Sequence, residues 1–317
     1  MKPLYSLFVL FELIPALLFA QYSTNDIEYY VDLNDREMRL ADYKDSREML
    51  LLKLAQLEVV NKSRKQYKAP PVQLDILASR IANKQCKEAA EQGFRGHWNT
   101  RGEKPYQRYA FGGGTDHVTE NASATWMEGG SFDRSPQSFA KLMVNLHGQF
   151  MAEIAPNDGH KQTVIDKYHN FVGLGCHMTA AEFRYYEEFI DRYAVTGPVP
   201  AKVRSGEEFT VEVTPAPGYF LYYAVAYYEK PPKAMAVAQV NRQSSYPDYT
   251  DETTLQYAPW DIIGYRTEGG KYNIPFKFDK KGSYYIQTMV DKKNPAGTTS
   301  FSTVGKIVAT GIVVIVE

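Results

Sequence analysis

The chain has 317 residues and is 44% hydrophobic, which is enough for two domains that each bury a core. Its formal net charge is −1 and its pI is near 6.6. This balance argues against a general attraction to nucleic acid or to an anionic membrane, so no nucleic-acid partner is expected.

The N-terminus has the pattern of a targeting segment. It has one early lysine, an apolar run from Leu4 to Ala20, and a small residue at Ala20 where cleavage is expected. The run is short for a membrane span and contains Glu12, so we favour a signal peptide at 1–20 over an uncleaved anchor. The mature protein would then be secreted, periplasmic or at the cell surface, with no membrane span. A polar lead follows at 21–44, and its first part, up to Asp35, is expected to be extended or poorly ordered.

Helical patterns then dominate up to residue 154. Leucines and Val60 recur at steps of one, three and four between residues 36 and 68, where the proline pair of "KAPP" follows. A second helix is predicted from Leu74 to Gly93, with an apolar face that includes Cys86. A third helix is predicted over 138–154, and His147 lies on its apolar stripe, which favours a core histidine.

After the third helix, the sequence predicts strands in place of helices. "NFVGLGCHM" and "EFRYYEEFIDRYAV" are predicted to be paired strands, so the first domain is expected to be an α/β sandwich over 45–195. A linker is predicted at 196–200. Short β-type runs separated by Pro/Gly turns then predict an Ig-like antiparallel β-sandwich of about seven strands over 201–317.

The chain has two cysteines, Cys86 and Cys176. In an exported protein, an even count is compatible with one disulfide. The alternative is two small buried residues that never meet, and the sequence alone does not place their Cα atoms within bonding reach.

Four motifs in the first domain occur in the order and spacing of a known family. They are an N-x-x-R element, an H-x-x-x-x-G-x-x-P-x-x-R segment, a Glu-Asn motif, and a Gly-His element followed by V-G-x-G. The residues that carry them are Asn61, Arg64, His97, Gly102, Pro105, Arg108, Glu120, Asn121, His160, Ile165 and 172–175. Together they resemble bacterial-type members of the CAP superfamily (cysteine-rich secretory, antigen 5 and pathogenesis-related proteins, which share an SCP-like domain).

The resemblance implies an α-β-α sandwich with a cavity where His97, Glu120 and His160 converge, together with Glu153. Glu153 matches a second glutamate of many eukaryotic members, whereas the bacterial-type pattern does not require one. Arg108 and Asn121 are expected to support the cavity, Arg108 by pairing with a carboxylate or carbonyl. Thr119 and Lys161 depart from the family pattern, which has glycine and arginine there.

The resemblance also bears on the cysteines. It places Cys86 and Cys176 where the second helix packs on the central strand, and on that basis we predict a Cys86–Cys176 disulfide. The bridge would close a loop of about 90 residues and contribute roughly 4 kcal/mol.

The predicted cavity residues are compatible with several functions. Two imidazoles, His97 and His160, and a carboxylate suit Zn²⁺ or another divalent metal, while Glu120 and His160 are the candidate acid–base pair. No nucleophilic cysteine or serine motif accompanies them. We therefore favour a non-enzymatic module that binds a small hydrophobic ligand, a glycan, a divalent metal or a cell-surface partner. The alternatives are a metal-assisted hydrolase using His97, Glu120 and His160, and a structural envelope protein with a vestigial cavity.

Overall fold

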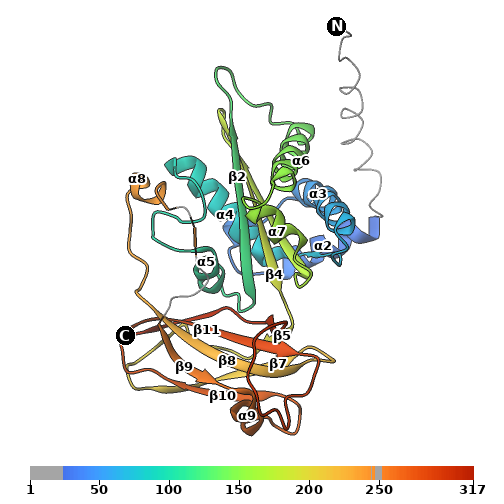
Figure 1. The fold of residues 1–317 in the computed structure, drawn as a ribbon. Helices are drawn as coiled ribbons and strands as arrows, with labels where there is room; N and C mark the ends of the chain where they lie inside the picture. The colour runs from blue at the N-terminus through green and yellow to red at the C-terminus, as the bar shows by residue number, and fades with distance from the viewer. Residues whose placement is uncertain (1–23, 244, 247–251) are drawn as a thin grey trace. The chain divides into compact units, whose positions relative to one another are not determined.

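A computed structural model describes residues 24–243, 245–246 and 252–317 of the protein (Figure 1). The predicted signal peptide at 1–20 lies outside these described residues. No helix in the described part of the chain is long and apolar enough to cross a membrane.

The chain folds into two compact units whose segments alternate along the sequence. The domain boundaries expected from the sequence remain predictions. The first unit contains the described residues up to Glu91, Asn121–Lys167 and Gly173–Glu187, and the second contains Gln92–Glu120, Tyr168–Val172 and the described residues of Glu188–Glu317.

The helices of the first unit begin and end where capping residues and prolines dictate. Ser46 accepts a hydrogen bond from the Met49 amide at 3.1 Å at the start of α3, and the "KAPP" prolines follow its end. Ser135 caps α6 in the same way, with a proline at the first helical position. Helices α3, α6 and α7 pack against one another (Figure 1). The helices of this unit are α2 (Thr24–Arg36), η1 (Ala41–Tyr43), α3 (Arg47–Gln66), α4 (Ile76–Gln92), α6 (Pro136–Ala152) and α7 (Gly159–Ile165).

The expectation of an extended lead before residue 36 is wrong, because this segment forms helix α2. Its polar composition hides a short helical stripe. Ile27 and Asn34 are buried, and Tyr30 and Val31 between them are partly buried. These four positions follow the i, i+3, i+4, i+7 spacing that packs one face of a helix, and α2 contacts α3.

A four-stranded sheet has the order β1-β3-β4-β2. Helix α4 packs so closely on β3 that a Cβ atom at Gly173 or Gly175 would lie 2.4 or 2.3 Å from a backbone carbon of α4. The glycines of the V-G-x-G motif therefore allow α4 to pack closely on β3. The strands are β1 (Gln73–Leu74), β2 (His117–Trp126), β3 (Phe171–Met178) and β4 (Glu182–Asp191).

The predicted Cys86–Cys176 disulfide is wrong, because the two cysteines are buried and are not bonded to each other. Adjacent residues of a strand face opposite sides, and Gly175 faces α4, the helix that carries Cys86. Cys176 therefore projects the other way, where its Sγ lies 3.7 Å from Met49 Sδ of α3. Cys86 packs with Ala82 and Tyr186. The second interpretation of the cysteines, as two small buried residues, describes the structure.

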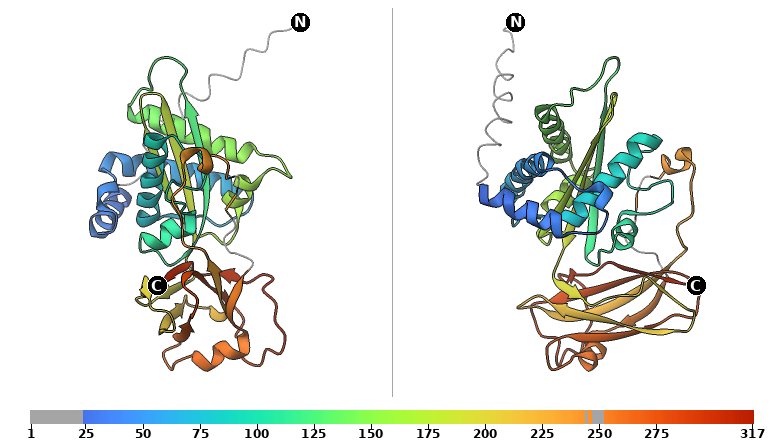
Figure 2. Two further views of the ribbon diagram at one scale, coloured as in Figure 1. Left: turned by 90° about the vertical axis from the view of Figure 1, so that its left-hand side faces the viewer. Right: turned by 180° about the vertical axis from the view of Figure 1, so that it is seen from behind.

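The second unit contains two sheets that share one hydrophobic core (Figure 2). In β7, Phe209, Val211 and Val213 are buried and alternate with more exposed residues, which is the period of a strand with one face on a core. The mixed helix and strand content predicted for residues 45–195 is confirmed, while the sandwich arrangement of each predicted domain stays a prediction.

The three-stranded sheet has the order β10-β7-β5, and the larger sheet has the order β6-β13-β11-β8-β9, with β12 paired to β11. The bounds are β5 (Ala194–Thr196), β6 (Lys202–Val203), β7 (Glu208–Pro215), β8 (Phe220–Glu229), β9 (Thr253–Tyr257), β10 (Tyr272–Lys277), β11 (Gly282–Asp291), β12 (Ile307–Val308) and β13 (Ile312–Val316). The described residues of the unit also form the short helical segments α5 (Pro105–Phe111), α8 (Val237–Val240), α9 (Pro259–Ile262) and η2 (Ile263–Tyr265).

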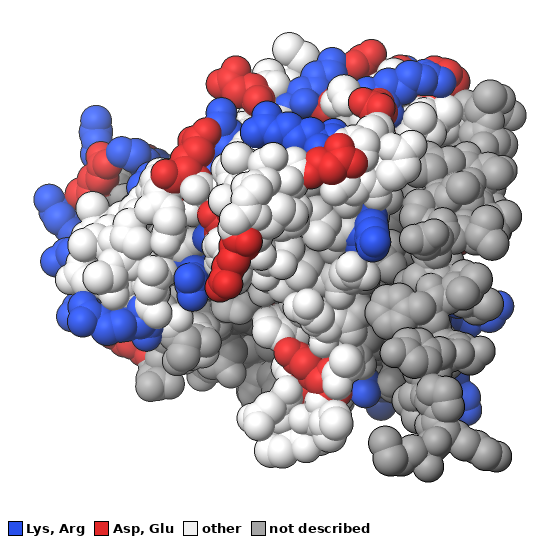
Figure 3. Space-filling view, turned by 90° about the horizontal axis from the view of Figure 1, so that it is seen from above, with Lys and Arg blue, Asp and Glu red and all other residues white. Residues whose placement is uncertain are grey.

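Surface charge on the face shown in Figure 3 is mixed in sign. Basic and acidic side chains lie close to one another in small groups there, and uncharged side chains fill the areas between the groups. This pattern accords with the net charge of −1 of the whole chain.

Candidate functional site

The second unit holds a cluster of charged side chains around Glu120, which lies on β2. His97 Nδ1 donates to Glu120 Oε1 at 2.8 Å, and an Arg108 Nη atom donates to Glu120 Oε2. Arg108 also donates to the backbone carbonyl of His97. Both carboxylate oxygens are therefore engaged, and one guanidinium joins the loop that carries His97 to the strand that carries Glu120.

Local sequence explains how these side chains reach one another. Gly93 and Gly96 have left-handed φ values of 79°, which favour glycine and turn the chain after α4 so that His97 follows directly. Helix α5 starts with Pro105 at its first turn, and Gln107 reaches back to the Lys104 amide at 3.0 Å. This short helix fixes the position of Arg108.

Burial and charge separate the two carboxyl groups of this cluster. Burial works to raise the pKa of Glu120, but the Arg108 charge and the hydrogen bond from His97 outweigh it and hold that pKa below its usual value. Glu188 lies on β4, with its Oε1 3.7 Å from Arg108, and both glutamate side chains are fully buried. Burial, and then the negative charge of Glu120, raise the pKa of Glu188 well above its usual value. The cluster thus contains two neighbouring carboxyl groups whose pKa values are shifted in opposite directions.

Tyr246 closes the cluster from a distant part of the chain. Its hydroxyl accepts from the Glu120 amide at 2.6 Å and donates to the Glu120 carbonyl at 3.0 Å. Its ring lies 4.4 Å from the His97 ring, with an interplanar angle of 55°. The adjoining Ser245 accepts a hydrogen bond from Trp98 Nε1 at 2.9 Å. Tyr246 therefore covers one face of the His97 ring.

The first unit holds a second histidine–glutamate pair. His160 Nδ1 donates to Glu153 Oε1, and the His160 amide donates to Glu153 Oε2 at 3.0 Å. Glu153 thus caps the first turn of α7, where amides lack helical partners. The His160 ring stacks on Phe150, and the His160 carbonyl accepts from Asn121 at 3.0 Å.

A third pair in the first unit involves His147, which is buried as the apolar stripe predicted. Its Nδ1 donates to Glu187 Oε1 at 2.7 Å, and its Nε2 lies 2.9 Å from the Ser63 hydroxyl. Tyr185 donates to the same glutamate oxygen at 2.8 Å. Burial and the charge of Glu187 raise the pKa of Tyr185 well above its usual value. A fully satisfied histidine of this kind is a core element.

The remaining buried histidines, His117 and His169, bind the same carboxylate in the second unit. His117 Nδ1 and His169 Nδ1 donate to the two oxygens of Asp191, at 2.9 and 2.7 Å. Burial opposes ionisation of Asp191, but the charge of His169 and the hydrogen bond from His117 outweigh it and lower its pKa. The Asp191 carboxylate thereby joins β4 to two other stretches of the chain, which carry His117 and His169.

The structure brings together His97, Glu120 and Arg108 in the second unit, and His160, Glu153 and Asn121 in the first. The convergence of all of them in one cavity remains a prediction. Sequence reasoning missed Glu188 and Tyr246. Glu188 had a signal, since two consecutive glutamates interrupt an aromatic strand, whereas Tyr246 had none because it lies 126 positions from Glu120.

The described part of the chain contains no group of three or more His, Cys, Asp and Glu side chains arranged to hold a metal ion. Within each pair, the imidazole Nδ1 donates to a carboxylate oxygen, so that nitrogen is not presented as a ligand. Zinc binding by His97 and His160 therefore stays a hypothesis for measurement.

Comparison with known proteins identifies the class of domain that these residues occupy. Residues 57–189 match the model of the cysteine-rich secretory protein family, the CAP family. The chain therefore contains a CAP domain, as the four motifs predicted, and both His97 and His160 fall inside it. No functionally curated protein matches the chain.

Three solved structures are similar to it. An extracellular SCP-domain protein from Bacillus anthracis is 16% identical, with a TM-score of 0.33 over 43% of this chain and 39% of that one. An outer surface protein from Borrelia burgdorferi is 15% identical, with a TM-score of 0.35 over 46% and 94%. A cysteine-rich secretory protein from Staphylococcus aureus is 17% identical, with a TM-score of 0.27 over 44% and 38%. The chain thus spans about two fifths of the Bacillus and Staphylococcus proteins.

Proposed function

We propose that the protein is a non-enzymatic ligand-binding module that acts outside the cytoplasm, at or beyond the cell envelope. The observation that carries this proposal is the state of Glu120, whose two carboxylate oxygens are taken by His97 and Arg108. A carboxylate with a lowered pKa and two charge-assisted hydrogen bonds is a weak general base. The cluster is suited to hold the loop after α4 in one place.

The extracellular location is part of the same proposal. It is supported by the apolar N-terminal run with a small residue at its end, and by the CAP domain at 57–189. The ligand class expected from the sequence is a small hydrophobic molecule, a glycan or a divalent metal. The β-rich part of the chain is the candidate for contact with a cell-surface partner.

A hydrolase is the second candidate, and one observation favours it. Glu120 and Glu188 are neighbouring carboxyl groups whose pKa values are shifted in opposite directions, an arrangement that acid–base enzymes use. Against it, both side chains are fully buried, so a substrate would have no access to either carboxyl group. We therefore rank binding above hydrolysis.

The test is a set of measurements on the full mature chain. Zinc content is determined after dialysis, hydrolysis is assayed on peptides and cell-wall material, and binding is screened by thermal shift against lipids and glycans. The proposal expects a ligand-dependent rise in Tm and no hydrolysis. Hydrolysis that disappears in Glu120→Gln, while circular dichroism shows that the variant is folded at the assay temperature, would overturn it in favour of the enzyme. Stoichiometric zinc that is lost in His97→Ala/His160→Ala would identify the ligand as a metal.

A further inference from the structure

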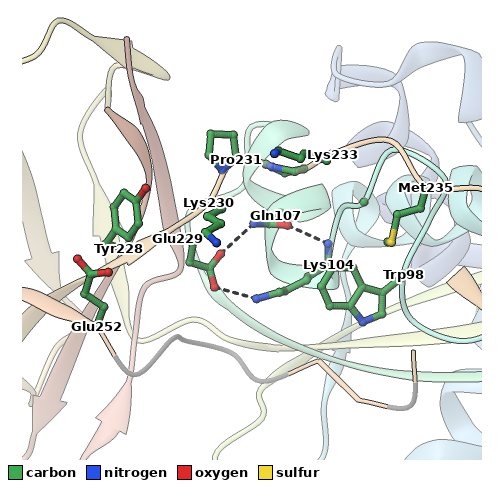
Figure 4. A pocket seen from close by; sticks show the side chains of 12 residues that line it. Trp98, Lys104, Gln107, Tyr228, Glu229, Lys230, Pro231, Lys233, Met235 and Glu252 are labelled. Atoms are coloured by element: carbon green, nitrogen blue, oxygen red, sulfur yellow. Dashed lines mark hydrogen bonds and ion pairs between the residues drawn. The ribbon is translucent and has the colours of Figure 1, made fainter. Parts of the chain in front are cut away.

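A cavity of about 580 Å³ lies in the second unit between two segments that are far apart in sequence (Figure 4). One wall is the stretch from Trp98 to Gln107, and the other is the end of β8 with the residues up to Met235. This volume is within the range of pockets that hold small organic ligands, roughly 300–1,000 Å³. Trp98, Tyr228, Pro231, Pro232 and Met235 supply apolar surface to it.

The two walls are joined to each other at both ends. At one end, buried Glu229 accepts from Lys104 Nζ at 2.8 Å and from Gln107 Nε2 at 2.9 Å, as drawn in Figure 4. At the other end, the Met235 amide donates to the Thr100 carbonyl at 2.8 Å. Between them, Gly102 approaches the Lys233 backbone so closely that a Cβ atom would lie 2.2 Å from its carbonyl oxygen. The cavity is therefore formed before any ligand arrives, which lowers the ordering cost of binding.

The charges around the cavity leave an excess of positive side chains. Glu229 is neutralised by Lys104, and Glu252 is paired with Lys280 at 2.8 Å. Lys230 and Lys233 also line the cavity and are exposed, and no ion pair joins either of them to another described residue. An anionic group at the rim would gain from both ammonium groups, while its apolar body would lie against the aromatic and proline side chains.

We propose that this cavity binds a small organic anion that has a flat apolar body and a single acidic group. Trp98 and Tyr228 contact the body, and Lys230 and Lys233 hold the acidic group at the rim. This inference rests on the proposed binding role but places it at a cavity separate from the Glu120 carboxylate. Trp98 joins the two regions, because it follows His97 and donates to Ser245 beside Tyr246.

The test uses two fluorescent probes that share an aromatic body and differ in charge, 1-anilinonaphthalene-8-sulfonate and the neutral N-phenyl-1-naphthylamine. The full mature chain is titrated with each probe. We expect saturable one-to-one binding of the sulfonate, weakened about tenfold in Lys230→Gln/Lys233→Gln, because two rim charges are removed. Binding of the neutral probe is expected to change less than about twofold in the same variant, since the apolar walls are kept.

The matched control is Lys292→Gln/Lys293→Gln, which removes two exposed lysines of the same unit that do not line the cavity. The inference is overturned by the absence of saturable sulfonate binding, by equal weakening in the control, or by equal weakening of both probes. Thermal unfolding verifies that each variant is folded. Hydrolysis in the assays described above would overturn the proposed function and leave this result standing, so the two failures are distinguishable.

Discussion

Two of the histidine–glutamate pairs in the CAP domain, His97–Glu120 and His160–Glu153, combine the same residue types but differ in structure. His97 and Glu120 have side chains that are 17% and 0% exposed, and Arg108 and Tyr246 also hold the glutamate. His160 and Glu153 are 34% and 24% exposed, and their glutamate caps a helix of seven residues. The first pair belongs to a buried charge network, and the second to a local helix start.

The difference shows what a motif does and does not specify. A His and a Glu at family positions predict that an imidazole and a carboxylate approach each other. Burial and the number of further partners decide whether the pair perturbs pKa values and stability, because charges removed from water depend on their neighbours. We therefore expect changes around Glu120 to be costly and changes around Glu153 to be mild.

The largest loss of stability is expected for Arg108→Met. This change removes the charge that compensates Glu120, which is fully buried, and lowers the free energy of unfolding by about 3–5 kcal/mol. Urea unfolding at pH 7, followed by circular dichroism, measures it. The matched control is Arg101→Met in the same loop, where the arginine is 40% exposed and pairs with Glu103. The control is expected to cost at most about 1 kcal/mol, and equal losses in the two variants would remove the contrast between buried and exposed pairs.

A change in pH dependence is expected for Glu188→Gln. The folded-state pKa of Glu188 is raised, so its contribution to stability is complete below the ordinary value of 4.5 and is lost as the pH rises toward the folded-state pKa. Glutamine keeps the shape and cannot ionise. We expect the variant to match the wild type near pH 4 and to exceed it at pH 8 by about 1–3 kcal/mol.

Urea unfolding at several pH values measures the effect. Glu182→Gln is the comparison, because this residue starts the same strand and pairs with Arg184. A stability difference between Glu188→Gln and wild type that stays constant from pH 4 to pH 8 would show that Glu188 is ionised in the folded protein.

Several helices and one strand of this fold could be predicted from the sequence, because local sequence patterns specify them. The apolar stripes, the serine caps and the prolines predicted α3, α4 and α6, and the V-G-x-G glycines marked β3. The side of the sheet to which a strand residue projects is not fixed by such local signals. The Cys86–Cys176 disulfide was therefore predicted wrongly, although the helix α4 and the strand β3 that carry the two cysteines were predicted correctly. Tyr246 could not be predicted, because its contact with Glu120 is long-range and no local pattern encodes such a contact.

A smaller loss is expected for Tyr246→Phe. The ring against His97 is kept, while both hydrogen bonds to the Glu120 backbone are removed. Because these backbone groups are partly buried, we expect a loss of about 1–2 kcal/mol in the free energy of unfolding. Tyr67→Phe, at a ring that is 46% exposed, is the control and should change stability by less than about 0.5 kcal/mol. A Tyr246→Phe variant as stable as this control would mean that the Tyr246 hydroxyl does not hold the Glu120 backbone in place.

The smallest effect is expected in a double-mutant cycle on His160 and Glu153. The variants are His160→Ala, Glu153→Ala and the combination, each unfolded in urea at pH 7. The pair is partly exposed, so solvent screens it, and its coupling energy should be at most about 1 kcal/mol. The parallel cycle on His97 and Glu120 should give a larger coupling, because Glu120 is fully buried and loses a charge-assisted partner. Equal couplings in the two cycles would show that burial does not separate the pairs. A larger coupling at His160 would make the exposed pair, rather than the buried one, the first place to look for a bound ligand.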